Sequence, residues 1–168
     1  MYYLNCFLFY SIFGYLLETI LAVFSNNNFQ SGIMYGPWTP IYGIGVISIL
    51  LLSNYFFINL HMNVITESII IFIISTIFLS CLEVIGGIVI EKMFDKVFWS
   101  YSDLKYNIGN YISIEMSLLW GLATIIFIYI LNPVFKNFIK KIPHIVSFLL
   151  SFAILFNLTL TIITKFKK

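Results

Sequence analysis

The sequence predicts an all-α membrane protein, a single-domain polytopic helix bundle that crosses the bilayer about five times. Of its 168 residues, 61% are hydrophobic and only 10% are charged, and the mean hydropathy is +1.00. A soluble domain carries about 25% charged residues. Because each transmembrane helix needs about 20 apolar residues, the chain has room for a few spans but for no large soluble domain. An ATPase module would have to lie on another chain.

The apolar runs place the five spans. They cover residues 3–24, 41–60, 68–90, 112–131 and 144–164. The first run has no positively charged start and no small-residue cleavage site after it, so we expect a retained span rather than a signal peptide. Asn132 and Pro133 end the fourth predicted span and Pro143 opens the fifth, because proline cannot continue a helix but fits its first turn.

The segment after the first span is the densest cluster of helix-breaking residues in the chain. Two prolines and three glycines fall within Gly36–Gly45, which predicts irregular backbone. Irregular backbone at membrane depth must be shielded from lipid, so we expect this segment to pack against helices and to help form a polar pocket. The alternative is a tight interhelical turn, but Trp38 and Tyr42 offer hydrogen bonds and stacking surfaces that favour the pocket.

Two glutamates, Glu18 and Glu83, lie inside predicted spans. Helical spacing places each on a face of small or polar residues, Ser11 and Gly14 for the first and Thr76, Ser80 and Gly87 for the second. Burying a carboxylate in a span costs about 2.5 kcal/mol or more, which makes it a functional-site hypothesis. Two carboxylates within about 8 Å of each other would suit proton coupling or cation binding. The predicted substrate- or ion-binding residues are Glu18, Glu83, Trp38, Tyr42, Ser11 and Ser80.

A structural role for Glu18 and Glu83 has equal weight. Each would stay protonated, or would accept a hydrogen bond from a Trp, a Tyr or a backbone N–H of Gly36–Gly45, and would lock helices together. Three further acids, Glu67, Glu91 and Glu115, lie near the ends of predicted spans. There we expect solvated charges.

Residues 91–111 form the one extended polar segment, in which three lysines are offset by three acids. Its aromatic residues suit headgroup depth, so the segment is predicted to be interfacial. In the fourth span a small-residue face has Trp120 beside it. The residues of that face are Ser113, Ser117, Gly121 and Thr124. The spacing Ser117-x-x-x-Gly121 is typical of helix packing rather than of chemistry.

The remaining signals exclude several classes of chemistry. Cys6 and Cys81 lack CxxC spacing, and His61 and His144 lie in separate connections, so neither a disulfide framework nor a metal site is expected. No Walker A, GxSxG or HExxH motif occurs. The sequence therefore predicts no cofactor, no nucleic-acid partner and no enzymatic activity. An intramembrane enzyme that uses the glutamate pair as acid and base is the least favoured hypothesis.

The lysines predict the orientation. Five spans place the termini on opposite sides of the membrane. The side of the C-terminus would carry six lysines, three in the polar segment and three in the tail, against three on the other side. By the positive-inside rule, the C-terminus is predicted to be cytoplasmic.

Several sequence blocks occur together and in order between about residues 7 and 133. They are Glu18, Gly36-Pro37-x-x-Pro40-Ile41-Tyr42-Gly43, Leu82-Glu83, Trp99-Ser100-Tyr101-Ser102, Asn107-x-Gly109 and Ser117-x-x-Trp120-Gly121. This combination resembles the bacterial family of putative ABC-transporter type IV, or CmpB-like, integral membrane proteins. That family commonly has an acid where Ser100 stands and a basic residue before the glycine corresponding to Gly32. Both charged residues are missing here, so charge pairing across those segments is not expected. The resemblance implies a small polytopic protein and brings no catalytic residues with it.

The leading hypothesis is a membrane component of a transport system, a permease-like subunit with a pocket built from Glu18, Glu83 and Gly36–Gly45. Five spans are few for a complete secondary transporter, and no inverted repeat is evident. A partner ATPase subunit or a second copy of the chain would therefore be required. The alternative is a non-transporting membrane scaffold or regulatory protein whose buried acids are structural. Both hypotheses describe a multi-pass protein of the cell membrane.

Overall fold

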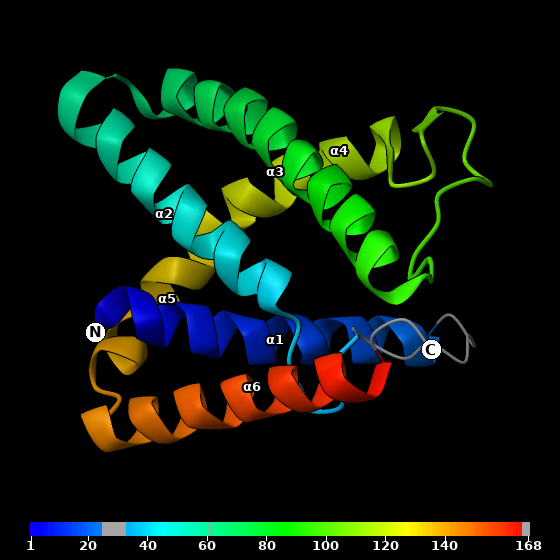
Figure 1. Ribbon diagram of the computed structural model, residues 1–168. Helices are drawn as coiled ribbons and strands as arrows, with labels where there is room; N and C mark the ends of the chain where they lie inside the picture. The colour runs from blue at the N-terminus through cyan, green and yellow to red at the C-terminus, as the bar shows by residue number, and fades with distance from the viewer. Residues whose placement is uncertain (25–32, 61, 166–168) are drawn as a thin grey trace. The chain divides into compact units, whose positions relative to one another are not determined.

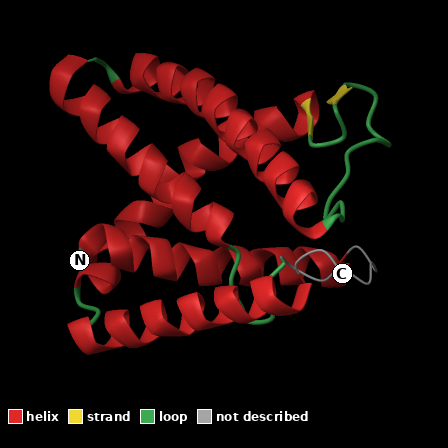
Figure 2. Ribbon diagram, in the orientation of Figure 1, coloured by secondary structure: helices red, strands yellow, loops and turns green. Residues whose placement is uncertain are grey.

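The computed structural model describes residues 1–24, 33–60 and 62–165, with residues 56–60 as backbone only. Helices and one short hairpin make up the regular structure of these residues, as Figure 2 shows, so the predicted all-α fold class is confirmed. The elements, seen in Figure 1, are α1 (Tyr2–Phe24), α2 (Pro40–Leu60), α3 (Val64–Phe94), β1 (Asn107–Ile108), β2 (Ile112–Ser113), α4 (Ile114–Ile126), the π-helical turn η1 (Phe127–Leu131), α5 (Asn132–Lys140) and α6 (His144–Lys165).

Four helical stretches in the described part of the chain are long and apolar enough to cross a membrane. They are Tyr2–Phe24, Val64–Phe94, Ile114–Lys140 and His144–Lys165. The apolar stretch Pro40–Tyr55 of α2 is shorter. At about 1.5 Å per residue, the 31 residues of α3 extend about 46 Å, more than the roughly 30 Å of a hydrocarbon core. Helix α3 is therefore long enough to reach beyond the hydrocarbon into the headgroup region.

The helix of the fourth predicted span does not end at Asn132 and Pro133, as predicted, but continues through both residues. The N–H of Asn132 donates to the carbonyl oxygen of Phe127, a π-type bond that widens the turn before Pro133. Pro133 has no N–H, and a wider turn is one way in which a helix accommodates such a missing bond. Helix α5 then extends the helical stretch to Lys140.

The chain divides into two compact units. The terminal unit comprises Met1–Ile47, Met93–Asp95 and Asn137–Lys168. The central unit comprises Ser48–Lys92 and Lys96–Lys136. Whether the chain behaves as a single domain stays a prediction.

In the terminal unit, the start of α2 packs closely on α1. Helix α2 begins at Pro40, so the irregular backbone predicted for Gly36–Gly45 is confined to the residues before Pro40. Proline fits the first helical position, because the N–H that it lacks would have no partner there. A Cβ at Gly43 would lie 2.5 Å from the hydroxyl oxygen of Ser11. Gly43 is therefore tolerated within the helix because it allows close approach to α1.

The segment before α2 packs against α1 and α6. Trp38 is only 5% exposed, and it belongs to a cluster with Leu8, Met34 and Ile154. The backbone N–H of Gly36 donates to the side-chain oxygen of Asn157 at 3.2 Å. Figure 1 shows α1 and α6 running side by side, with this segment beside them. Hydrogen bonds and apolar burial together hold this non-helical backbone in place.

A polar contact joins α1 to α5 and α6 near the start of α1. The Asn5 side chain donates to the carbonyl oxygen of Ile139 at 3.2 Å, and its oxygen accepts from the Ser147 hydroxyl at 2.6 Å. All three residues are buried. Since each polar atom of Asn5 has a partner, its burial is compensated.

In the central unit, α3 and α4 meet through small residues. The Ser80 hydroxyl donates to the Ser117 hydroxyl at 2.8 Å. A Cβ at Gly121 would overlap the Thr76 hydroxyl and would lie 2.8 Å from the Phe72 ring. The Ser117-x-x-x-Gly121 pattern thus serves helix packing, as its spacing predicts.

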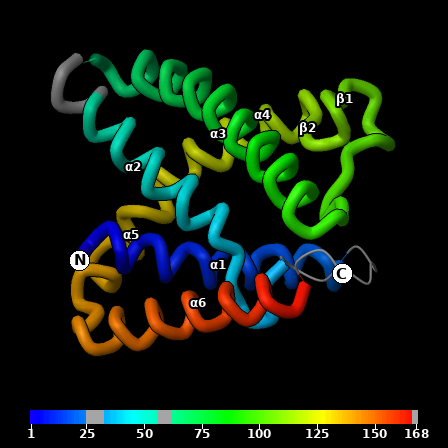
Figure 3. The backbone as a smooth tube through the Cα atoms, viewed as in Figure 1, coloured from blue at the N-terminus to red at the C-terminus, as the bar shows by residue number. Residues whose placement is uncertain are grey.

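The segment between α3 and α4 is a loop that ends in a hairpin. Figure 3 shows the two short strands at its end. They pair antiparallel, with Asn107 opposite Ser113 and Ile108 opposite Ile112. The turn between them contains two consecutive residues with positive φ, Gly109 at 58° and Asn110 at 66°. Glycine and asparagine tolerate this left-handed conformation.

Candidate functional site

The Glu83 carboxylate is the buried acid of the central unit. Glu83 is only 6% exposed, and it lies in an apolar helix that is long enough to span a membrane. The Tyr101 hydroxyl donates to one carboxylate oxygen at 2.8 Å. The Trp120 indole N–H donates to the other at 2.5 Å. Glu83 therefore connects α3 to α4 and to the loop between them.

The local backbone explains how Tyr101 reaches this position. Its N–H donates to the carbonyl oxygen of Asn110 at 2.9 Å, and its own carbonyl oxygen accepts from the N–H of Leu104 at 3.0 Å. Asn107 fixes the same turn, because its side chain donates to the carbonyl oxygens of Ser102 and Leu104. Tyr101 is thus held by the hairpin turn rather than by a helix.

Trp120 is placed by the packing of α4 on α3. Ser113 caps the N-terminus of α4 by accepting from the N–H of Met116 at 3.1 Å. One turn further, Ser117 contacts Ser80. Helical side chains lean toward the N-terminus of their helix. The long indole of Trp120 can therefore reach back to Glu83.

A second carboxylate, Glu91, lies two turns beyond Glu83 on the same face of α3 and accepts a hydrogen bond from the Tyr111 hydroxyl. Gly87 lies between the two acids. A Cβ there would lie 2.6 Å from the Tyr111 ring and 3.3 Å from the Trp99 ring. We call Glu83, Gly87 and Glu91 the docking face of α3, because the aromatic side chains of the loop rest on all three.

The docking face corrects one expectation. Glu91 was predicted to be a solvated charge, but it is half-buried and bound to a tyrosine. The hydrogen bond from the Tyr111 hydroxyl to the Glu91 carboxylate raises the pKa of that phenol, because it stabilises the protonated form. Glu91 was named from the sequence only as a solvated charge, although Glu83, Gly87 and Glu91 are spaced i, i+4 and i+8, which places them along one face of a helix.

The other predicted site residue of the central unit, Ser80, has a packing role. Its hydroxyl donates to the carbonyl oxygen of Thr76 at 2.6 Å and to Ser117. The Thr76 hydroxyl is buried and has no hydrogen-bond partner among the residues that the structure describes. The face that carries Glu83 therefore includes a polar group that is not satisfied locally.

Four predicted site residues belong to the terminal unit. Ser11 is fully buried, donates to the carbonyl oxygen of Phe7 at 2.6 Å, and accepts at its own carbonyl from the N–H of Thr39 at 3.0 Å. The Tyr42 ring packs on Gly14, and Trp38 lies in the apolar cluster. Glu18 is half-buried in α1. Because Glu18 and Glu83 belong to different units, their convergence on one pocket stays a prediction.

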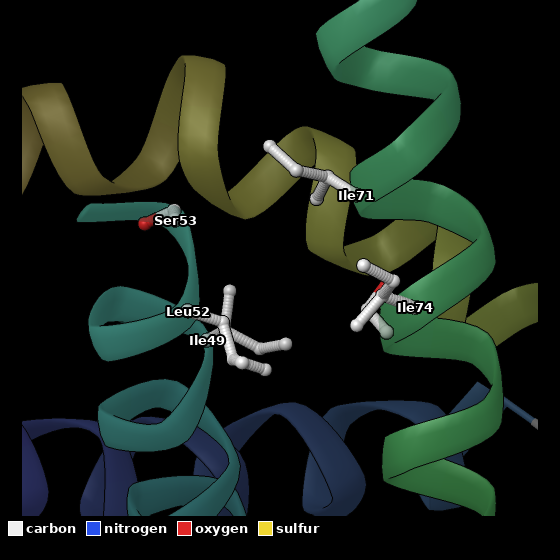
Figure 4. Close-up of a pocket in the computed structure, with 6 residues that line it drawn as sticks. Ile49, Leu52, Ser53, Ile71 and Ile74 are labelled. Atoms are coloured by element: carbon white, nitrogen blue, oxygen red, sulfur yellow. The ribbon is translucent and has the colours of Figure 1, made fainter. Parts of the chain in front are cut away.

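A small cavity in the central unit lies between α2 and α3. Figure 4 shows Ile49 and Leu52 of α2 facing Ile71 and Ile74 of α3. Its volume of about 10 Å³ holds about one water molecule. Ser53 and Ser75 also line it, but both hydroxyls donate to carbonyl oxygens of their own helices. This cavity is too small and too apolar to be the predicted polar pocket.

Metal binding finds no support in the described ranges 1–24, 33–60 and 62–165. They contain no group of three His, Cys, Asp or Glu side chains that could hold an ion. Both cysteines are free, Cys6 buried and Cys81 exposed.

Comparisons with known proteins identify one family. No curated protein and no solved structure matches the chain. A family model described as putative ABC-transporter type IV matches residues 5–166. The match includes Glu83, Tyr101 and Trp120, and it extends past the predicted block to include α6. With its long apolar helices, the chain is a multi-pass membrane protein that belongs to the putative ABC-transporter type IV family.

Proposed function

We propose that the chain is the membrane-embedded, permease-like component of a transport system, and that Glu83 is its ionisable coupling group. The observation that carries this proposal is the buried Glu83 carboxylate, bonded at once to the loop through Tyr101 and to α4 through Trp120. An ionisable residue inside a membrane helix is costly and most often marks an ion or substrate path. The family is one of putative ABC-transporter components, which supports a transport role.

The two donors give the carboxylate a mechanical role. When Glu83 gains a proton or a cation, its negative charge is neutralised, and its hydrogen bonds from Tyr101 and Trp120 weaken, because hydrogen bonds to ionised groups are about twice as strong as neutral ones. The loop and α4 would then loosen from the docking face. Proton or cation occupancy is thereby coupled to a change in helix packing, as transport requires.

The remaining predicted site residues complete the proposed pocket. Glu18 would supply the second carboxylate, with Ser11, Trp38 and Tyr42 as lining groups from the same unit and Ser80 next to Glu83. The unsatisfied Thr76 hydroxyl supports a polar path along the Glu83 face of α3.

Energy would come from a partner, since the sequence has no nucleotide-binding motif. We propose an ATPase subunit as this partner, with an ion gradient or a second copy of the chain as the other routes to a complete transporter. The C-terminus is proposed to be cytoplasmic, so a fluorescent protein fused there should mature and fluoresce in cells.

The test is purification of the full chain in detergent, followed by identification of co-purifying proteins by mass spectrometry. A co-purifying ATP-binding subunit is the expected result. Purified protein of full abundance without any ATP-binding subunit would contradict the ABC-type proposal.

One observation favours a second function, a non-transporting scaffold. Both Glu83 oxygens accept hydrogen bonds within the protein, as expected of an acid that only locks helices together. On this account Glu83→Gln leaves partner binding and cellular phenotype intact. The transport proposal instead predicts loss of uptake or export at normal protein abundance.

A further inference from the structure

Helix α5 is amphipathic, and it exposes both lysines and apolar side chains. Lys136 and Lys140, spaced i and i+4, share one face. Val134 and Phe138, with the same spacing, share another and are 65% and 59% exposed. A short helix with exposed lysines on one side and exposed apolar groups on another is typical of the membrane interface.

The last residues of α5, from Asn137 onwards, belong to the terminal unit. Ile139 is fully buried, and its carbonyl oxygen accepts from the Asn5 side chain. The Phe138 ring lies 5.8 Å from the Phe9 ring, between centroids. The end of α5 that carries Lys140 is therefore held by its neighbours in the terminal unit.

The charged residues of α5 and of the turn after it are all lysines. Lys141 follows Lys140 in the turn after the helix, and both side chains are exposed. No acid occurs in the sequence after Glu115, and α1 has its first acid at Glu18, far from the Asn5 contact. The Lys140 ammonium lies 6.0 Å from the centre of the Tyr2 ring, an aromatic group suited to the interface. The start of α1, α5 itself and α6 thus supply no counter-charge.

The other lysine-rich segment is different. Lys92, Lys96 and Lys105 each lie within two residues of an acid, which are Glu91, Asp95 and Asp103. That segment carries its own counter-charges, whereas no acid lies near Lys136, Lys140 and Lys141 in the sequence.

We propose that α5 and the turn after it bind the headgroup of an anionic phospholipid. Lys136, Lys140 and Lys141 contact the phosphate, and Val134 and Phe138 lie beside the acyl chains. A bilayer lipid fits better than a soluble anion, because the lysines stand next to exposed apolar side chains rather than in an enclosed site. This lipid binding does not depend on the proposed transport function. It requires a negatively charged headgroup, and it can occur in either leaflet.

The test uses the purified full chain in a neutral detergent. It is titrated with phosphatidylglycerol and, separately, with phosphatidylcholine of the same acyl chains, and native mass spectrometry counts the bound lipids. Wild type should retain phosphatidylglycerol preferentially. The triple variant K136Q/K140Q/K141Q should bind it at least about tenfold more weakly, since each lysine at an anionic surface contributes about fivefold.

Two controls keep the result interpretable. K92Q/K96Q/K105Q removes the same charge from the segment that carries its own counter-charges and should bind as wild type does. K136R/K140R/K141R keeps the charge and should also bind as wild type does, which separates lost binding from misfolding. Equal binding of the two lipids, unchanged binding in K136Q/K140Q/K141Q, or an equal loss in K92Q/K96Q/K105Q would overturn the proposal. Displacement of phosphatidylglycerol by equimolar inorganic phosphate would overturn it in favour of a soluble anion site.

Discussion

The indole of Trp120 donates to the Glu83 carboxylate at 2.5 Å across 37 positions of sequence, and it does so from the helix whose Ser117 contacts Ser80. The same carboxylate also holds Tyr101 of the loop. Three segments that the sequence separates therefore meet at one acid.

Removing the Tyr101 hydroxyl should destabilise the protein. Tyr101→Phe leaves one oxygen of a buried carboxylate without its donor, which costs about 1–3 kcal/mol. Thermal unfolding of the purified protein in detergent measures this loss. Tyr106→Phe, at an exposed tyrosine of the same loop, serves as the control and should unfold as wild type does. Equal unfolding temperatures for both variants would show that the Tyr101 bond has no net effect.

Adding a methyl group at Gly87 should lift the loop from the docking face. The new Cβ would lie 2.6 Å from the Tyr111 ring, and overpacking of this kind costs about 1–3 kcal/mol. Limited proteolysis within residues 96–111 should be faster in Gly87→Ala than in wild type. Ile85→Ala, on the exposed side of the same helix, should be cleaved as wild type is. Unchanged cleavage of Gly87→Ala would mean that the loop is held mainly by other contacts.

Tyr111 should titrate above the ordinary range of a tyrosine, because its hydroxyl donates to Glu91. A folded-state pKa above the unfolded value of about 10 stabilises the protein below that pH, and the stabilisation is lost as pH rises through the folded pKa. Tyrosinate absorbance, taken as the difference between wild type and Tyr111→Phe, measures the titration. Glu91→Gln should lower this pKa toward its usual value. An identical titration in Glu91→Gln would contradict the assignment.

Glu18 and Glu83 should lie within about 8 Å of each other if they share a proton or cation. In a chain freed of Cys6 and Cys81, a short bifunctional thiol reagent should cross-link the pair Glu18→Cys and Glu83→Cys. The pair Ser80→Cys and Ser117→Cys, whose hydroxyls lie 2.8 Å apart, is the positive control. Efficient cross-linking of the control without any at 18 and 83 would remove Glu18 from the proposed pocket.

The features that could be predicted from the sequence are those that depend on the local periodicity of its residues. The helical class, the burial of Glu83 and the small-residue contact at Ser117 and Gly121 all follow from spacing along one helix. The donors to Glu83 could not be predicted in this way, because Tyr101 and Trp120 are brought there by tertiary packing. They come from the loop and from α4, whereas the sequence pointed to Gly36–Gly45 as their source.

The differences at helix ends have a related origin. Gly43 lies inside α2 because close contact with Ser11 outweighs its low helix propensity. The helix passes Pro133 because a π turn accommodates the missing bond. In both places tertiary contacts or a change of helix type override a residue that normally ends a helix.

The central claim is that Glu83 exchanges a proton or cation while it holds the loop and α4. Difference infrared spectroscopy of the purified protein over a pH series tests it most directly, with Glu83→Gln as the reference. The account predicts a carboxyl C=O band that titrates in wild type, is missing in Glu83→Gln, and changes frequency in Tyr101→Phe. If the spectra of wild type and Glu83→Gln respond identically to pH, Glu83 does not titrate, and its role is confined to packing.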